Sequence, residues 1–147
     1  SDFRPGAARQ PTVAAGGTRR ALGICYEDAY GSPNLPARAS AGVLVNVTND
    51  AWFGHSWARH QHFQIARMRA IEAQRPLLRA ANDGISALVG AHGEVLAQAA
   101  QFEPTVLRGT VQPRVGLPPY ARVGNWLIVL LSLLGAALAA GVKRRHG

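Results

Sequence analysis

Cysteine, methionine and lysine each occur only once in this chain of 147 residues. The single cysteine, Cys25, excludes an internal disulfide, so cysteine usage does not identify the redox compartment. The single lysine, Lys143, lies near the carboxyl end. Acidic residues are also few, since eight Asp and Glu stand against sixteen Lys and Arg and leave a formal net charge of +8.

The distribution of basic residues and histidines argues against a nucleic-acid partner and against a metal site. The basic residues are almost all arginines scattered from Arg4 to Arg145, and aromatic residues do not alternate with them as a base-stacking surface requires. His55, His60 and His62 have no Cys, Asp or Glu at a familiar metal-ligand spacing. We therefore expect no nucleic-acid partner, no metal and no cofactor.

An uncharged apolar run over residues 126–142 predicts a transmembrane helix. At 1.5 Å per residue such a helix is about 25 Å long, at the lower limit for crossing a bilayer. Trp126 is suited to one membrane interface, and the basic residues that follow predict that 143–147 form a cytoplasmic tail. The part of the chain before the span is then expected on the opposite side of the membrane.

The rest of the chain alternates between strand and helix patterns, as in an α/β protein. Residues 1–18 are expected to form a loop entering the domain, residues 19–115 the domain itself, and residues 116–125 a linker. The expected elements are strand 20–25, helix 33–41, strand 42–48, helix 60–74, and strands 77–81, 86–90, 94–98 and 106–112.

Cys25 ends the first expected strand, where an apolar run meets a polar turn. A cysteine in this position is placed as a nucleophile, and the N–H groups of the following turn can stabilise an oxyanion. The alternative is a buried cysteine that acts as a small hydrophobic residue. Serine-hydrolase chemistry is excluded, because the chain lacks a Gly-x-Ser-x-Gly motif.

Five short motifs follow one another along the chain. They are Gly-Ile-Cys-Tyr-Glu at 23–27, Asn-Val-Thr-Asn-Asp-Ala-Trp-Phe-Gly at 46–54, Gln-His-Phe-Gln-Ile-Ala-Arg-Met-Arg-Ala at 61–70, Arg-Pro at 75–76 and Asn-Asp-Gly at 82–84. Together they resemble the carboxyl half of bacterial apolipoprotein N-acyltransferases, a membrane-embedded branch of the nitrilase (carbon–nitrogen hydrolase) superfamily. The resemblance runs from about residue 23 to the end of the chain. It departs from the family at Asp83, where a second Asn is more common.

The resemblance implies the carboxyl-terminal part of a nitrilase-like αββα sandwich, followed by one transmembrane helix. It places the domain on the periplasmic side of a bacterial inner membrane. It also implies that Cys25 takes an acyl chain from a phospholipid as a thioester. The enzyme then passes this chain to the terminal amine of a diacylglyceryl-cysteine lipoprotein.

Family members also use a general-base Glu and a Lys that supports the oxyanion, both located earlier in the sequence. Neither has a counterpart here, because the only Lys is Lys143 and every Glu lies at or after Glu27. The chain starts at Ser1 without a Met or a signal peptide. We therefore expect an upstream part of the same protein to supply both groups, and the fragment alone to be inactive.

Four more residues, Tyr26, Glu27, Asn49 and Phe53, match family positions that are needed for activity or lie near the active site. Tyr26 is implied to give an oxyanion N–H donor and Glu27 a supporting group, with a core tyrosine and a solvated carboxylate as the alternatives. Asn49, Trp52 and Phe53 are candidates for the substrate pocket. The alternatives are turn formation for Asn49, and lipid contact or simple packing for Trp52.

Two other classes of function remain open. A membrane-tethered nitrilase-type amidase would use Cys25 to hydrolyse small amides, with water in place of an amine as the acyl acceptor. A non-catalytic, membrane-anchored binding domain would be favoured if the sequence before Ser1 lacked a Glu and a Lys in nitrilase context.

Overall fold

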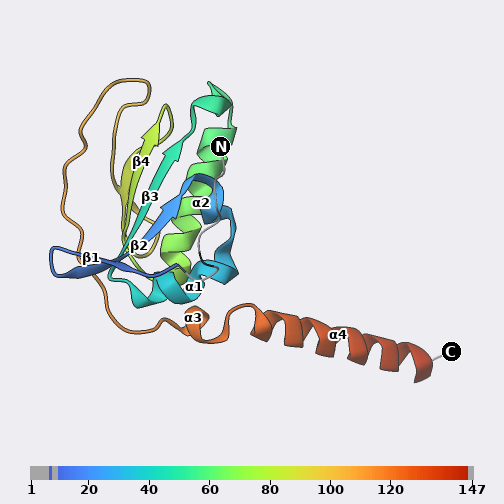
Figure 1. The fold of residues 1–147 in the computed structure, drawn as a ribbon. Helices are drawn as coiled ribbons and strands as arrows, with labels where there is room; N and C mark the ends of the chain where they lie inside the picture. The colour runs from blue at the N-terminus through green and yellow to red at the C-terminus, as the bar shows by residue number, and fades with distance from the viewer. Residues whose placement is uncertain (1–6, 8–9, 146–147) are drawn as a thin grey trace.

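One mixed sheet of six strands forms the centre of the structure, a computed structural model that describes residues 7 and 10–145 (Figure 1). In sheet order, which is also chain order, the strands are β1 (Val13–Ala15), β2 (Thr18–Ile24), β3 (Val43–Asn49), β4 (Leu77–Asn82), β5 (Ala87–Val89) and β6 (Val95–Gln98). Strands β2, β3 and β4 are parallel, and the other neighbours are antiparallel.

Helices connect the three parallel strands. α1 (Gly31–Ser40) leads from β2 to β3, and α2 (Ala58–Ala73) leads from β3 to β4. Parallel strands have their carboxyl ends at one edge of the sheet, so the segments leaving β2 and β3 start side by side. These segments contain the short 3-10 helices η1 (Cys25–Ala29) and η2 (Ala51–Phe53). Cys25 therefore lies at this edge, as expected.

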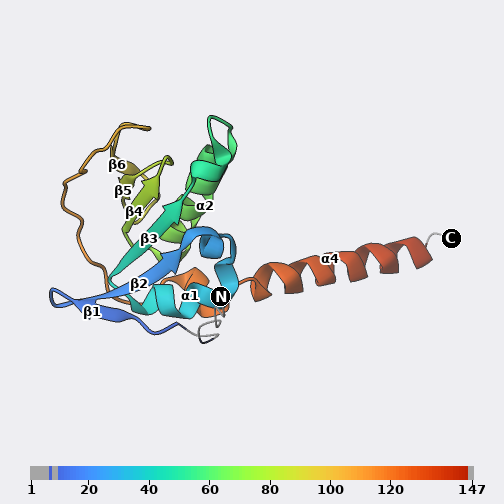
Figure 2. The ribbon, with the colours of Figure 1, turned by 45° about the horizontal axis from the view of Figure 1, so that its top comes forward.

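Both connecting helices cover the same face of the sheet (Figures 1 and 2). An apolar stripe of α2 packs on this face, and its members are buried in one cluster with Leu44 of β3 and Leu77 of β4. They are Phe63, Ala66, Ala70 and Ala73. Three alanines on the buried side let the helix pack closely on the strands. Polar side chains on the same side of α2 thereby reach the sheet edge.

The opposite face of the sheet has no helix and no second sheet over it in the described part of the chain, and its β2 side is open. Leu22 and Ile24 of β2 and Val47 of β3 alternate with buried neighbours and are 51%, 64% and 47% exposed. The described residues thus form two layers, one sheet and one layer of helices, whereas the predicted αββα sandwich has four. The open face is apolar, as required of a face on which a second sheet packs.

The prediction of a strand over residues 106–112 is wrong. This segment belongs to an irregular stretch that runs outside the sheet (Figure 1). Leu107 lines a groove on the open face together with Leu78 and Leu88, while Val106 is 80% exposed. The segment therefore lies over apolar side chains on the face of the sheet. It does not pair with an edge strand, so its backbone adds no hydrogen bonds to the sheet.

β1 lies within the segment 1–18 that the sequence predicts as a loop. It pairs with β2. Gly16 and Gly17 form the tight turn between the two strands, and their φ angles are +55° and +72°. Residues 1–6 and 8–9 of this segment lie outside the described residues. The other strands and helices predicted between residues 20 and 98 have observed bounds within two residues of those expected.

Two helices follow the sheet. α3 (Pro119–Val123) lies in the predicted linker 116–125, and α4 (Trp126–Arg145) projects away from the sheet (Figures 1 and 2). Within the described residues no helix is long and apolar enough to cross a membrane, so the span predicted over 126–142 is not confirmed. The last two residues of the predicted tail 143–147 lie outside the described part of the chain.

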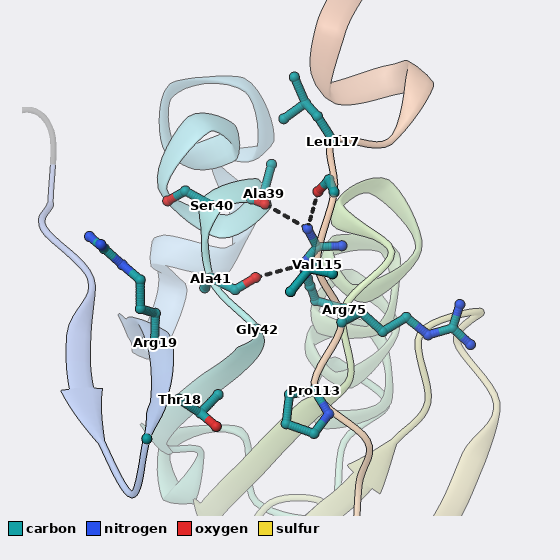
Figure 3. Close-up of a pocket in the computed structure, with 13 residues that line it drawn as sticks. Thr18, Arg19, Ala39, Ser40, Ala41, Gly42, Arg75, Pro113, Val115 and Leu117 are labelled. Carbon is teal, nitrogen blue, oxygen red and sulfur yellow. Dashed lines mark hydrogen bonds between the residues drawn. The ribbon is translucent and has the colours of Figure 1, made fainter.

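Arg75 ties together the ends of the two covering helices (Figure 3). Its buried guanidinium donates hydrogen bonds to five carbonyl oxygens, which belong to Ala39, Ala41, Ala73, Gln74 and Gly116. Carbonyls at the end of a helix have no partner within it, so Arg75 satisfies α1 and α2 at once and anchors the segment before α3. Burial, with the nearby Arg114 guanidinium, lowers the pKa of Arg75.

We predict that Arg75→Lys lowers the free energy of unfolding by about 2–4 kcal/mol, because an ammonium has three donors and leaves buried carbonyls unpaired. Urea denaturation measures this change. Arg114→Lys is the matched control, since Arg114 lines the same pocket but is exposed, and it should change the free energy by less than about 0.5 kcal/mol. An Arg75→Lys variant as stable as the wild type would show that the contacts which lysine cannot make do not contribute to stability.

Candidate active site

Cys25 is held in a strained backbone conformation. It follows β2 directly, opens η1 and has a φ angle of +51°. A residue with a side chain occupies this left-handed region at a cost of about 1–2 kcal/mol, so surrounding contacts must stabilise it. The Cys25 residue is half-buried. The chain therefore turns sharply at the predicted nucleophile.

Three side chains hold the backbone around Cys25. The carbonyl oxygen of Cys25 lies 3.4 Å from Nδ2 of Asn46 and 3.3 Å from Nε2 of His62. On the preceding residue, the N–H of Ile24 donates to Oε2 of Glu27 at 2.7 Å. These contacts come from β3, α2 and η1, so three separate elements fix the turn.

Asp50, His62 and Arg79 form a buried ionic cluster next to this turn. Asp50 Oδ1 lies 2.9 Å from Nδ1 of His62, and Asp50 Oδ2 accepts from Nη2 of Arg79 at 3.0 Å. The Thr48 hydroxyl donates to Asp50 Oδ1 at 2.9 Å. All three members of the cluster are at most 4% exposed. His62 is therefore oriented by a carboxylate at one ring nitrogen while the other faces Cys25.

The cluster continues to Asp28 of η1 and Arg38 of α1. Arg38 donates to Asp28 Oδ1 at 3.2 Å, and Arg79 donates to Asn46 Oδ1 at 2.5 Å. Burial raises the pKa of Asp28, and the charges of Arg38 and Arg79 oppose this change. Burial likewise lowers the pKa of Arg38 and of Arg79, opposed by the neighbouring carboxylates. The site thus keeps several charges paired away from water.

Strand register explains why these residues meet. Gly23, Asn46 and Arg79 are direct neighbours across β2, β3 and β4, on the face that the helices cover. Two glycines leave room for the carboxylates. A Cβ atom on Gly84 would lie 2.3 Å from Oδ2 of Asp50, and one on Gly23 would lie 3.1 Å from Oδ1 of Asp28.

The predicted site residues divide into two groups. Tyr26 and Phe53 lie against the His62 ring, each with ring centroids 5.9 Å from it. Glu27 acts on the turn itself through Ile24.

Asn49 and Trp52 lie further out on the same edge. Asn49 Oδ1 accepts from Nδ2 of Asn82 at 3.2 Å and from the N–H of Ala51 at the same distance, which joins the ends of β3 and β4. Trp52 is 86% exposed.

The sequence does not predict this ionic cluster. It offers His62 only as a metal candidate and Asp50 only as part of a turn, and it indicates no role for Asp28, Asn46 or Arg79. A signal was present, because Asn46 and Arg79 interrupt otherwise apolar strands, where an unpaired polar group is costly. Their partners could not be named without the register of the sheet.

The sequence profile of carbon–nitrogen hydrolases matches residues 3–118, and the chain therefore belongs to the carbon–nitrogen hydrolase family. The resemblance to apolipoprotein N-acyltransferases is also confirmed. The chain is 48% identical to the apolipoprotein N-acyltransferase of Methylococcus capsulatus and 44% identical to that of Chromobacterium violaceum, each over 99% of this chain. It spans only 29% and 28% of the length of those two proteins.

Solved structures show the same fold. An amidase from Nesterenkonia sp. is 25% identical, with a TM-score of 0.58 over 70% of this chain and 41% of the amidase. A carbon–nitrogen hydrolase from Helicobacter pylori is 19% identical, with a TM-score of 0.57 over 67% of this chain and 42% of that protein. The chain thus corresponds to less than half of either structure, in agreement with its open sheet face.

We predict that Glu27→Gln keeps the reaction rate of Cys25 within about threefold of the wild type, because the amide oxygen still accepts from the Ile24 N–H. Glu27→Ala removes this hydrogen bond and should lower the rate by about tenfold. The measurement is the rate at which Cys25 is acylated by an activated ester, followed by intact mass. If Glu27→Gln loses as much as Glu27→Ala, the carboxylate acts as a base and the supporting role is wrong.

Proposed function

We propose that this chain is the carboxyl-terminal part of an apolipoprotein N-acyltransferase, with Cys25 as its nucleophile. The main support is the identity of 39–48% to such enzymes over nearly the whole chain. The strained turn at Cys25 adds to it, because an exposed strand end presents a nucleophile to substrate. The family implies a phospholipid as acyl donor and a diacylglyceryl lipoprotein as acceptor.

In the first half-reaction the sulfur of Cys25 attacks the carbonyl carbon of a phospholipid ester. A thiol in water has a pKa of about 8.5, so a base takes its proton as the C–S bond forms. The carbonyl oxygen becomes an oxyanion, which accepts a hydrogen bond from the N–H of Tyr26. The ester C–O bond then breaks, a lysophospholipid leaves with the proton, and the acyl chain stays on Cys25 as a thioester.

In the second half-reaction the terminal amine of the lipoprotein attacks the thioester carbonyl. The base accepts the proton that the amine loses and returns it to the sulfur of Cys25 as the C–S bond breaks. The products are an amide on the lipoprotein and the free Cys25 thiol. Because the acyl chain is held covalently between the two steps, the mechanism is ping-pong.

Two groups required by this mechanism are proposed to come from an upstream part of the same protein. The family uses a Glu as base and a Lys near the oxyanion, and the only lysine here is Lys143 in α4. The exposed apolar face formed by Leu22, Ile24 and Val47 supports this proposal. A second sheet packed there would complete the αββα sandwich and bring both groups to the edge where Cys25 lies.

The proposal also places the domain at the periplasmic face of a bacterial inner membrane, with α4 in contact with lipid. Apolar side chains are exposed on α4, including Leu127, Ile128 and Leu130 at 57–63%. A substrate dissolved in lipid requires its enzyme to work at the interface, and an exposed apolar helix suits that position.

A nitrilase-type amidase is the second candidate, favoured by one observation. The Nesterenkonia neighbour is an amidase that shares the fold at 25% identity. Such an enzyme would share the Cys25 acyl intermediate and release it to water. The acceptor therefore separates the two candidates, since only the acyltransferase forms an amide with a lipopeptide amine.

We predict that the complete protein gains one acyl chain on Cys25 when phospholipid is added without an acceptor, and that hydroxylamine removes it. Cys25→Ala should gain none and should transfer nothing to a diacylated lipopeptide. Cys25→Ser is expected to be acylated slowly and then to stall, because an oxygen ester is a poorer acyl donor to an amine than a thioester. Intact mass spectrometry reports each state. A Cys25→Ala variant that transfers at the wild-type rate would end the nucleophile assignment.

We also predict that the 147-residue chain alone forms no triacylated product, because the base and the oxyanion lysine are not among its residues. The test incubates the purified chain with phospholipid and a diacylated lipopeptide and records the mass of the peptide. The complete protein is the positive control. A triacylated product from the chain alone would locate the base within these 147 residues.

A further inference from the structure

We propose that His62 and Asn46 are positioning residues that fix the peptide between Cys25 and Tyr26, so that its N–H is aimed at the oxyanion. This inference rests on the proposed function, because it concerns the donor used in both acyl-transfer steps. It assigns a role to two buried side chains that do not contact the substrate. Both would act through the backbone.

The geometry of a trans peptide supports this role. The C=O and the N–H of one peptide plane point in opposite directions. The carbonyl oxygen of Cys25 is turned toward Asn46 Nδ2 at 3.4 Å and His62 Nε2 at 3.3 Å, and both of these side chains are at most 2% exposed. The N–H of Tyr26 must therefore point away from the buried cluster. Tyr26 itself is 55% exposed, so that direction leads toward the open side of the turn.

The surroundings of His62 make it a donor to this carbonyl. Its Nδ1 lies 2.9 Å from a carboxylate oxygen of Asp50, and its Nε2 lies 3.3 Å from the Cys25 oxygen. The Cys25 oxygen is a carbonyl and can only accept, so Nε2 is the donor in that contact. Arg79, 3.2 Å from Nδ1, has its own acceptor in Asp50 Oδ2 at 3.0 Å. Asp50 thus directs the ring, and the ring directs the peptide.

The Cys25–Tyr26 peptide needs holding because its orientation decides where the Tyr26 N–H points. The φ of +51° at Cys25 is unfavourable for a residue with a side chain, so surrounding contacts must stabilise the turn. Rotation of the peptide that follows Cys25 would turn the Tyr26 N–H away from the reacting carbonyl. Loss of one oxyanion donor typically lowers the rate by about 100- to 1,000-fold. Weakening the contacts from Asn46 and His62 to the Cys25 oxygen should therefore lower the rate of acyl transfer.

The test compares two reactions of Cys25 in the complete protein. Acylation by p-nitrophenyl butyrate develops an oxyanion, whereas alkylation by iodoacetamide displaces iodide and develops none. His62→Gln keeps a nitrogen donor near the position of Nε2, while His62→Asn can still reach Asp50 but falls short of the Cys25 oxygen. Asn46→Asp keeps an acceptor for Arg79 and replaces the donor to Cys25. His92→Gln, on an exposed turn, is the control.

We expect His62→Asn and Asn46→Asp to slow acylation by at least about 30-fold and alkylation by less than about threefold. His62→Gln should stay within about fivefold of the wild type in both reactions, and His92→Gln should match it. The proposal is overturned if acylation and alkylation fall together, if acylation is unchanged, or if His62→Gln is as slow as His62→Asn. Should His62→Asn not fold, the Asn46→Asp variant decides alone.

The proposed function is tested separately, with phospholipid as the acyl donor to the wild type. If the wild type takes no acyl chain from phospholipid while the ester series shows selective loss, the proposed function fails and the positioning role stands. If the wild type is not acylated by the ester either, the Tyr26 N–H stabilises no oxyanion at Cys25 and the positioning role fails too.

Discussion

The ion pair between Arg79 and Asp50 is the contact on which the rest of the site depends. Both side chains are fully enclosed, so removing either partner would leave an unpaired buried charge, at a cost of about 3–5 kcal/mol. The pair joins the middle of β4 to the end of β3. Through Asp50 it orients His62 of α2, and through Asn46 it reaches β2. A single guanidinium therefore couples three strands and a helix.

Close packing makes this cluster possible. The buried side of α2 is mainly alanine, so the helix lies near enough to the sheet for His62 to reach both Asp50 and Cys25. Gly84 provides the space that Asp50 occupies, since a Cβ atom there would overlap the carboxylate. The small residues of this core thus leave the space that the charged cluster occupies. A larger side chain at these positions would push the helix or the carboxylate away from the turn.

The sequence predicts elements well where one local pattern decides the outcome. The apolar run of β3 and the stripe of α2 are local patterns, and both are found within two residues of their expected bounds. The end of β2 at Cys25 is also local. The strand prediction fails for the segment 106–112, because its composition suits a strand while its position over the sheet depends on the tertiary structure.

The ionic cluster illustrates the opposite case. His62 and Asp50 are twelve residues apart and meet Arg79 only because β3 and β4 pair in one particular register. A shift of one residue would turn Arg79 to the open face and leave Asp50 buried without its partner. Long-range register of this kind is not encoded in a single local window. The sequence alone could therefore propose Cys25 as the nucleophile, and it could not predict which side chains hold the backbone at Cys25.

The two faces of the sheet have different roles in the proposed enzyme. The face covered by helices contains the groups that fix the backbone at Cys25, and all of them lie within this chain. The open face, with Leu22, Ile24 and Val47, is where the rest of an αββα sandwich would pack. Cys25 lies between these two faces, at the end of β2, which has side chains on both. The turn can thus be shaped by one half of the protein, while a base and an oxyanion lysine can be added from the other half without disturbing it.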